Sequence, residues 1–273
     1  VYVADQLDLQ IVETPSGKVQ VVSLPWIRRS RYLSREDTRS LTIEQINRSI
    51  QDRLAILLQQ QIEELDPSMP AIFSGHLSLN TAVTSSEKSM LLGHDPVLNL
   101  STVANPSFDY VALGHIHRQQ ILNYNPIVAY SGSLQRVDFG EEKDTKGFYL
   151  VDLDPSQPKG HRIIEHRFVT VNARGFLTIE LEIKSTDEDP TKTILQALSR
   201  HKLEGNIVKV VISMPSSLIP FIRMDEVNDS LLRAHHVAGV NFRADEEKTT
   251  RIGDIPPEGL TPQEALLRYW QNR

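Results

Sequence analysis

Cysteine is absent from all 273 residues of the chain. Its absence excludes disulfide scaffolds, cysteine-ligated zinc, iron–sulfur clusters and thiol catalysis. Long apolar runs are absent too, because the longest ones, such as residues 207–212, have the length of a strand and fall far short of a membrane span. Residues 1–5 have neither the basic nor the apolar region of a signal peptide. We therefore expect a cytoplasmic protein without a membrane partner.

Neither sign of charge dominates the composition. The chain has 29 Lys and Arg against 35 Asp and Glu, which gives a net charge of −6. This balance does not indicate a nucleic-acid binder, and it does not exclude one, because local clusters can be basic on an acidic protein. With 40% hydrophobic and 23% charged residues, the chain has the composition of a globular protein with a sizeable core rather than of a disordered or fibrous one.

The first part of the chain reads as strands with one long helix. Two β-rich runs at 7–13 and 18–24 enclose a turn with Gly17 and predict a hairpin. Thr42 followed by Gln45 is a capping-box signature, and the helical spacing of the apolar residues behind it predicts a helix over roughly 43–65. Further strands are predicted at 71–73, 110–113, 127–130, 147–152 and 162–169.

The pattern changes after that point to strands alternating with helices. The predicted order is a strand at 176–183, a helix at 190–201, a strand at 207–213, a helix at 224–235 and a strand at 239–243. Such an alternation predicts a small α/β domain. A polar, proline-containing segment and a final helix that begins near Pro262 follow it.

Histidines stand where two of the predicted strands end. His76 follows Gly75, and His115 and His117 belong to a Gly-His-Ile-His run. On an extended backbone, two residues that are two positions apart project to the same side. Three imidazoles at one edge of a sheet can ligate Zn, Mn, Fe or Ni, and the ligands alone do not choose among them. A surface turn is the alternative for a single Gly-His pair, and the other six histidines are assigned no chemistry.

Three sequence runs carry a resemblance to a known family. They are Ser74-Gly-His76, residues 108–117 with Gly-His-Ile-His, and residues 130–148, which contain Tyr-Ser-Gly-Ser-Leu-Gln-Arg and Lys-Gly-Phe. They resemble the SbcD family, the nuclease subunits of the bacterial SbcCD complex, within the calcineurin-like metallophosphoesterases. Gly-His-Ile-His alone would indicate only the metallophosphoesterase superfamily. The run around Tyr130 narrows the resemblance to the SbcD family.

The resemblance implies an α+β architecture in three parts. Residues 1–168 would be the C-terminal part of a metallophosphoesterase β-sandwich flanked by helices. Residues 169–246 would be a small α/β capping domain. Residues 247–273 would be a linker and a partner-binding helix.

The resemblance also implies an activity. The complete protein would hydrolyse DNA phosphodiesters with two Mn²⁺ ions, Mg²⁺ being the alternative, as an exonuclease on duplex ends and an endonuclease on hairpins. It would act in DNA repair, recombination and replication, as a homodimer, with an SbcC-like SMC-type ATPase. Two other functions stay open: a phosphoesterase for small non-DNA substrates, and a non-enzymatic module that docks an SbcC-like coiled coil.

The chain departs from the family pattern at the metal motifs. By the resemblance, His76 and His115 would bind one metal and His117 the other, but the family motifs Asp-x-His, Gly-Asp and Asn-His-Asp have no match before His76. Three neutral imidazoles cannot neutralise two divalent ions, and Mn²⁺ or Mg²⁺ prefers carboxylate oxygen. We therefore retain no catalytic residue, expect the chain to begin within the phosphoesterase domain, and expect it alone to be inactive or nearly so.

Two further groups of residues are predicted to bind partners. Arg28, Arg29 and Arg31 are candidates for DNA phosphate contacts, with a solvated basic loop as the alternative. Arg136 follows the Ser-Gly-Ser loop and is a candidate for the same role nearer to the histidines. One face of the final helix is predicted to dock the SbcC-like partner, or else to fold back on its own domain; its residues include Leu266, Tyr269 and Trp270.

Overall fold

The computed structural model describes residues 2–34, 39–84, 96–245 and 263. These residues form two units, of which the first ends at Phe176 and the second begins at Leu177. The boundary predicted after residue 168 falls within strand β10, Ile163–Thr170. Within the described part of the chain, no helix is long and apolar enough to cross a membrane.

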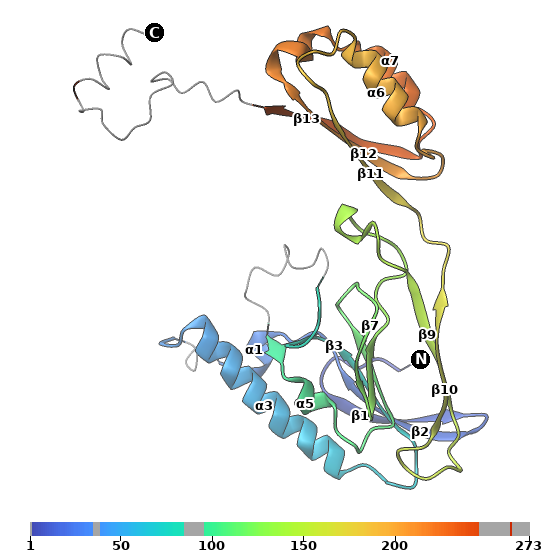
Figure 1. Cartoon of the computed structure of the whole chain (residues 1–273). Helices are drawn as coiled ribbons and strands as arrows, with labels where there is room; N and C mark the ends of the chain where they lie inside the picture. The colour runs from blue at the N-terminus through green and yellow to red at the C-terminus, as the bar shows by residue number, and fades with distance from the viewer. Residues whose placement is uncertain (1, 35–38, 85–95, 246–262, 264–273) are drawn as a thin grey trace. The chain divides into compact units, whose positions relative to one another are not determined.

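The first unit is built on a six-stranded sheet in the order β1-β2-β3-β6-β8-β7 (Figure 1). The four inner strands are parallel to their neighbours, and an antiparallel strand closes each edge. Parallel strands end at the same edge of a sheet, so the loops that follow them gather there. The strands are β1 (Asp8–Thr14), β2 (Gly17–Leu24), β3 (Ala71–His76), β6 (Tyr110–Gly114), β7 (Gln120–Tyr124) and β8 (Ile127–Tyr130).

Helix α3, Ile43–Glu63, confirms the predicted long helix and its start. The Thr42 hydroxyl accepts from the Gln45 N–H at 3.3 Å, and the Gln45 side chain accepts from the Thr42 N–H at 2.8 Å. This reciprocal pair satisfies backbone donors that the first turn leaves free. The buried residues of the helix share a core with the inner strands; that core includes Ile50, Leu54, Leu58, Val22, Phe73 and Val111.

Smaller elements complete the first unit. Strands β9 (Gly147–Leu153) and β10 confirm the two strands predicted at 147–152 and 162–169, and they pair in the antiparallel sense. Edge strand β7 was not predicted, because Gln120 and Asn123 break the apolar pattern of that segment. The remaining elements are α1 (Arg29–Tyr32), β4 (Ser78–Leu79), β5 (Val97–Leu98), α5 (Leu100–Val103) and the 3-10 turn η1 (Phe139–Glu141).

In the second unit, strands alternate with helices in the predicted order. Its sheet has the order β11-β12-β13, with β12 parallel to β13, and it has its own apolar core. The elements are β11 (Phe176–Glu182), α6 (Pro190–Ser199), β12 (Ile207–Pro215), η2 (Ser216–Phe221), α7 (Met224–Leu231) and β13 (His236–Asp245).

One helix of this unit is shorter than predicted. The sequence predicts a helix over 224–235, whereas α7 ends at Leu231 and His236 already begins β13. The carbonyl of Asn206 accepts from the N–H groups of His235 at 2.9 Å and His236 at 3.4 Å. These bonds draw the chain away from the helix toward the sheet.

The described residues therefore form a mixed fold of sheets with few helices, consistent with a metallophosphoesterase-like fold. The β-sandwich, the capping role of the second unit and the three-part division stay predictions. The predicted partner-binding face of the final helix, with Leu266, Tyr269 and Trp270, lies outside the described residues.

Candidate functional site

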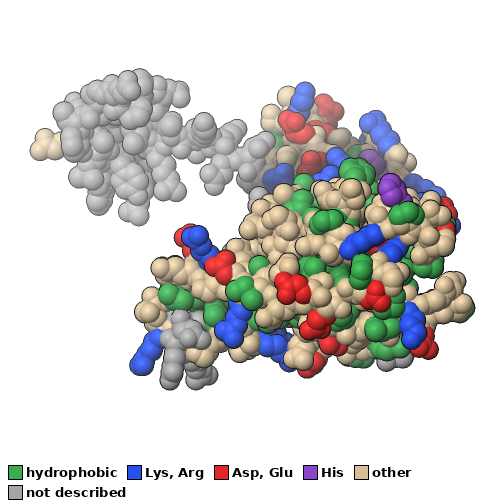
Figure 2. All heavy atoms as spheres, turned by 90° about the horizontal axis from the view of Figure 1, so that it is seen from below, with side chains coloured by type: hydrophobic (Ala, Val, Ile, Leu, Met, Phe, Trp, Pro, Cys, Tyr) green, Lys and Arg blue, Asp and Glu red, His purple; other side chains and the backbone are tan. Residues whose placement is uncertain are grey.

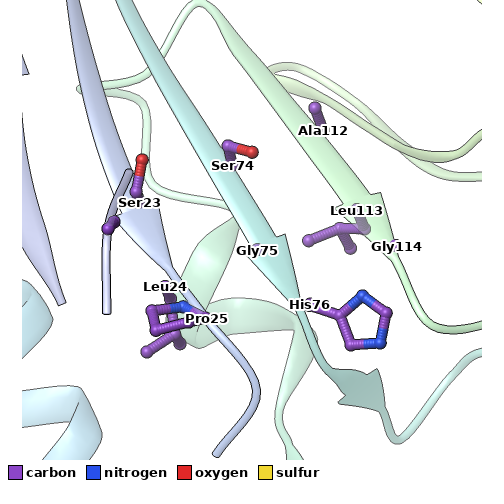
Figure 3. A pocket seen from close by; sticks show the side chains of 10 residues that line it. Ser23, Leu24, Pro25, Ser74, Gly75, His76, Ala112, Leu113 and Gly114 are labelled. Carbon is purple, nitrogen blue, oxygen red and sulfur yellow. The ribbon is translucent and has the colours of Figure 1, made fainter. Parts of the chain in front are cut away.

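His76 lies at the edge where the parallel strands end. It is the last residue of β3, and in the register of the sheet it is paired with Gly114, the last residue of β6. Figure 3 shows the imidazole at the tip of β3, turned toward the end of β6. A Cβ atom on Gly114 would lie 3.1 Å from the Nδ1 atom of His76. The glycine therefore leaves room for the ring.

The two histidines of the Gly-His-Ile-His run have different neighbours. The prediction that both lie on an extended backbone was wrong, because β6 ends at Gly114 and His115 has a φ of 94°. A non-glycine residue rarely adopts that left-handed conformation, which costs free energy and is often found at functional sites. The ring of His115 lies 5.3 Å from that of His76, centroid to centroid. The ring of His117 instead contacts Glu141.

A tryptophan joins the first two histidines. Trp26 follows the end of β2, and its ring centroid lies 4.7 Å from that of His115 and 5.7 Å from that of His76. Three aromatic rings from the ends of three adjacent parallel strands therefore cluster at one edge of the sheet.

A buried ion pair holds the side chain of His117. The Nδ1 atom of His117 lies 2.8 Å from an oxygen of Glu141, whose side chain is fully buried. The other carboxylate oxygen lies 2.8 Å from the Nζ atom of Lys146, also fully buried, and that ammonium lies 3.6 Å from Asp144. An ionised carboxylate only accepts hydrogen bonds, so Nδ1 of His117 is the donor in this contact and Nε2 is the other ring nitrogen.

The backbone of His117 is held as well. Its carbonyl accepts from the Nζ atom of Lys146 at 3.0 Å and from the N–H of Ser133 at 3.1 Å. Gly132 has a φ of +79°, and a Cβ atom there would lie 2.5 Å from the same carbonyl oxygen. The loop after β8 therefore approaches His117 as closely as only glycine allows.

A pocket opens beside His76 (Figure 3). Its volume is about 410 Å³, and most of its side chains are small, among them Ser23, Ser74 and Ala112. Partial burial lowers the pKa of His76 from its ordinary value of 6.5, and the charge of His117 lowers it further. This shift favours the uncharged imidazole, which is the form that binds metal ions.

These residues fit the imidazole part of a metal centre. His76 and His115 are adjacent, and a carboxylate orients His117 through Nδ1, as is usual for ligating histidines. Among the described residues, however, no group of three or more His, Asp or Glu is placed to hold a metal ion. The structure thus brings His76 and His115 together and gives His117 a separate setting. All three stay predicted ligands.

The predicted DNA-binding arginines have different surroundings. The guanidinium of Arg136 donates to the carbonyls of Glu141 at 3.1 Å, Asp144 at 2.7 Å and Arg174 at 3.0 Å, which favours a role in holding these loops. Arg29 donates to the side chain of Asn47. On the face in Figure 2, acidic and basic side chains alternate among the described residues, without a continuous basic surface.

The groups that hold His117 were not predicted from the sequence. Glu141 and Lys146 stand within the run that carries the family resemblance, but nothing in Gly-Glu-Glu tells which glutamate is buried. Trp26, the aromatic residue after β2, was not among the predicted site residues. Its position at a strand end, as for the histidines, was the available signal.

Comparisons with known proteins indicate the class of protein to which the chain is related. No protein-family model matches the chain. The chain is 25% identical over 189 residues to the SbcD subunit of the SbcCD nuclease from Staphylococcus epidermidis, covering 68% of this chain and 46% of that protein. It is 30% identical over 107 residues to the DNA double-strand break repair protein Mre11 of Methanocaldococcus jannaschii, covering 37% and 28%. It is 33% identical over 104 residues to the SbcD protein of Staphylococcus saprophyticus, covering 38% and 27%.

The chain thus spans less than half the length of these curated relatives. The matches, which include an uncharacterized metallophosphoesterase of Bacillus subtilis, relate it to the metallophosphoesterases. Within that class, the relationship is to the SbcD- and Mre11-type nuclease subunits, as the sequence runs around His76, His115 and Tyr130 indicated.

Proposed function

We propose that the chain is part of an SbcD-like, metal-dependent nuclease subunit that hydrolyses DNA phosphodiesters. The observation that carries the proposal is the pair of adjacent imidazoles, His76 and His115, at the ends of two parallel strands. The names of the relatives, two nuclease subunits and a DNA double-strand break repair protein, support DNA as the substrate. Manganese is the proposed metal, with magnesium as the alternative.

The residues of this chain would hold and orient the ligands of such a site. A bound divalent ion supplies Lewis acidity for cleavage of a phosphodiester. The lowered pKa of His76 favours its uncharged ring, and Glu141 accepts a hydrogen bond from Nδ1 of His117, so Nε2 is the nitrogen of that ring that would bind a metal. Among the described residues, His76 and His115 do not belong to a group of three or more His, Asp or Glu that could hold a metal ion. For that reason we propose that this chain alone is inactive or nearly so.

The partner proposal rests on the names of the relatives. Two of them are SbcD proteins of an SbcCD complex, which supports an SbcC-like ATPase as the partner of this protein. Duplex ends and hairpins are the proposed substrates, a homodimer the proposed assembly, and the cytoplasm the proposed location. The predicted contact, with Leu266, Tyr269 and Trp270, can be tested by capture on the base of an SbcC-like coiled coil.

The nuclease proposal is tested on the protein purified from its source cells. Replacing His115 by Ala is expected to reduce Mn²⁺-dependent cleavage of linear duplex DNA by at least the roughly 10–100-fold that loss of an outer-shell partner costs a metal site. His161→Ala is the matched control, because His161 is exposed and has no place in the site. Equal cleavage by both variants would contradict the assignment. Failure of the unchanged protein to cleave DNA, with capture of the coiled coil retained, would favour the non-enzymatic docking function.

A further inference from the structure

Trp26 is exposed although it belongs to the cluster of rings at the sheet edge. Its exposed fraction is 38%, and its ring is tilted by 39° against that of His115. His115 therefore covers only part of the indole, and the remainder is open to solvent. An exposed indole can stack on the face of any nucleobase, whatever the base.

The surroundings of this indole are cationic. A pocket of about 280 Å³ is lined by Trp26, Tyr32, Arg28, Arg31 and Asp5 among others. The carboxylate of Asp5 lies 3.2 Å from the guanidinium of Arg31, so these two charges offset each other. Arg28 is exposed and makes no ion pair within the ranges that the structure describes. The pocket therefore retains one cation beside an open aromatic face.

We propose that Trp26 and Arg28 form a stacking subsite for an unpaired nucleotide of a DNA strand. The base lies on the indole, and the guanidinium of Arg28 contacts a phosphate of the same strand. Because Trp26 also contacts His115 and His76, this nucleotide lies next to the predicted metal ligands. The proposal rests on the proposed nuclease function and deepens it, since such a subsite would select DNA strands whose bases are unpaired.

Base stacking and phosphate binding can be separated with two probes. One is a short oligothymidylate, and the other is an abasic oligomer of the same length, which keeps the phosphates and lacks the bases. The chain has only two tryptophans, Trp26 and Trp270. In the Trp270→Phe background, stacking of thymine on Trp26 is expected to quench the fluorescence of the single remaining tryptophan, and the abasic oligomer is expected to leave it unchanged.

Affinities are measured by fluorescence anisotropy of labelled oligomers, without metal. Trp26→Leu is expected to weaken oligothymidylate binding roughly tenfold and to leave abasic binding unchanged, because base–aromatic stacking contributes about 1–3 kcal/mol per base. Trp26→Phe is expected to restore most of the affinity. Arg28→Gln is expected to weaken both oligomers alike. Far-UV circular dichroism checks that each variant is folded.

The outcomes distinguish this subsite from the proposed function. Quenching by oligothymidylate together with the selective loss in Trp26→Leu supports the stacking subsite. Equal binding of both oligomers, unaffected by Trp26→Leu, would overturn it and leave a DNA-binding protein that holds only phosphates. If neither oligomer binds, the result would overturn the subsite and count against the nuclease function as well.

Discussion

Replacing Glu141 by Gln tests the buried ion pair that holds His117. The substitution keeps the size of the side chain and removes its charge. Lys146, whose side chain is fully buried, then loses the charged carboxylate at 2.8 Å and keeps the carboxylate of Asp144 at 3.6 Å and the carbonyl of His117 at 3.0 Å. We therefore expect the variant to be less stable than the parent chain. We also expect the orientation of the His117 ring to be less well fixed.

The magnitude follows from the burial of both partners. Removing one partner of a buried ion pair costs about 3–5 kcal/mol, because it leaves an uncompensated charge. Asp144 offsets part of that charge, so we expect a loss near the lower end, about 3 kcal/mol in the free energy of unfolding. For a unit of this size that corresponds to a melting temperature lower by roughly 6–12 °C.

The assay is thermal and urea unfolding of the chain with four variants. Glu13→Gln is the matched control, because the Glu13–Lys18 pair is exposed and pairs of that kind contribute little. Lys146→Met is measured alone and with Glu141→Gln, and the double variant is expected to be more stable than Glu141→Gln alone, since it no longer buries a charge. Nitrogen NMR should show the hydrogen bond at Nδ1 of His117 in the parent chain and in Glu13→Gln, and should show it weakened in Glu141→Gln. A Glu141→Gln variant as stable as Glu13→Gln would refute the reasoning.

Two further predictions concern the same edge of the sheet. Gly132→Ala should destabilise the chain in urea unfolding more than Gly160→Ala. Both glycines have a positive φ (+79° and +84°), but only a Cβ atom on Gly132 would meet a carbonyl oxygen, at 2.5 Å. Equal losses of stability in the two variants would contradict this close approach. Because the pKa of His76 is lowered in the folded chain, the unfolded chain binds a proton on this ring more tightly than the folded chain does. The free energy of unfolding is therefore highest above about pH 6.5, and it falls as the pH is lowered from there toward the folded-state pKa. Urea midpoints should show this fall, and His76→Asn should reduce it; an unchanged pH profile in that variant would contradict the assignment.

Local signals were enough to predict much of the first unit. The capping box at Thr42 and Gln45 marked the start of α3 to the residue. The glycine-histidine pairs marked the ends of β3 and β6, and the parallel order of the sheet then brings these ends together. Such predictions succeed because a cap or a strand end depends on neighbouring residues.

The parts that could not be predicted depend on contacts between distant segments. Because His115 has a positive φ, the side chains of His115 and His117 have different neighbours. On an extended backbone, both side chains would have projected to the same side. The burial of Glu141 depends on Lys146 and on the loop after β8. Arg136 looked like a free cation in the sequence, whereas its guanidinium is bonded to carbonyls from two loops.

The most direct test of the central claim is the manganese content of the protein isolated from its source cells. The unchanged protein, His115→Ala and His161→Ala are dialysed together against Mn²⁺ and then against buffer, and the retained metal is measured by atomic emission. We predict that the unchanged protein and His161→Ala retain manganese and that His115→Ala loses most of it. Equal metal content in all three, or none in the unchanged protein, would contradict a metal site at the ends of β3 and β6.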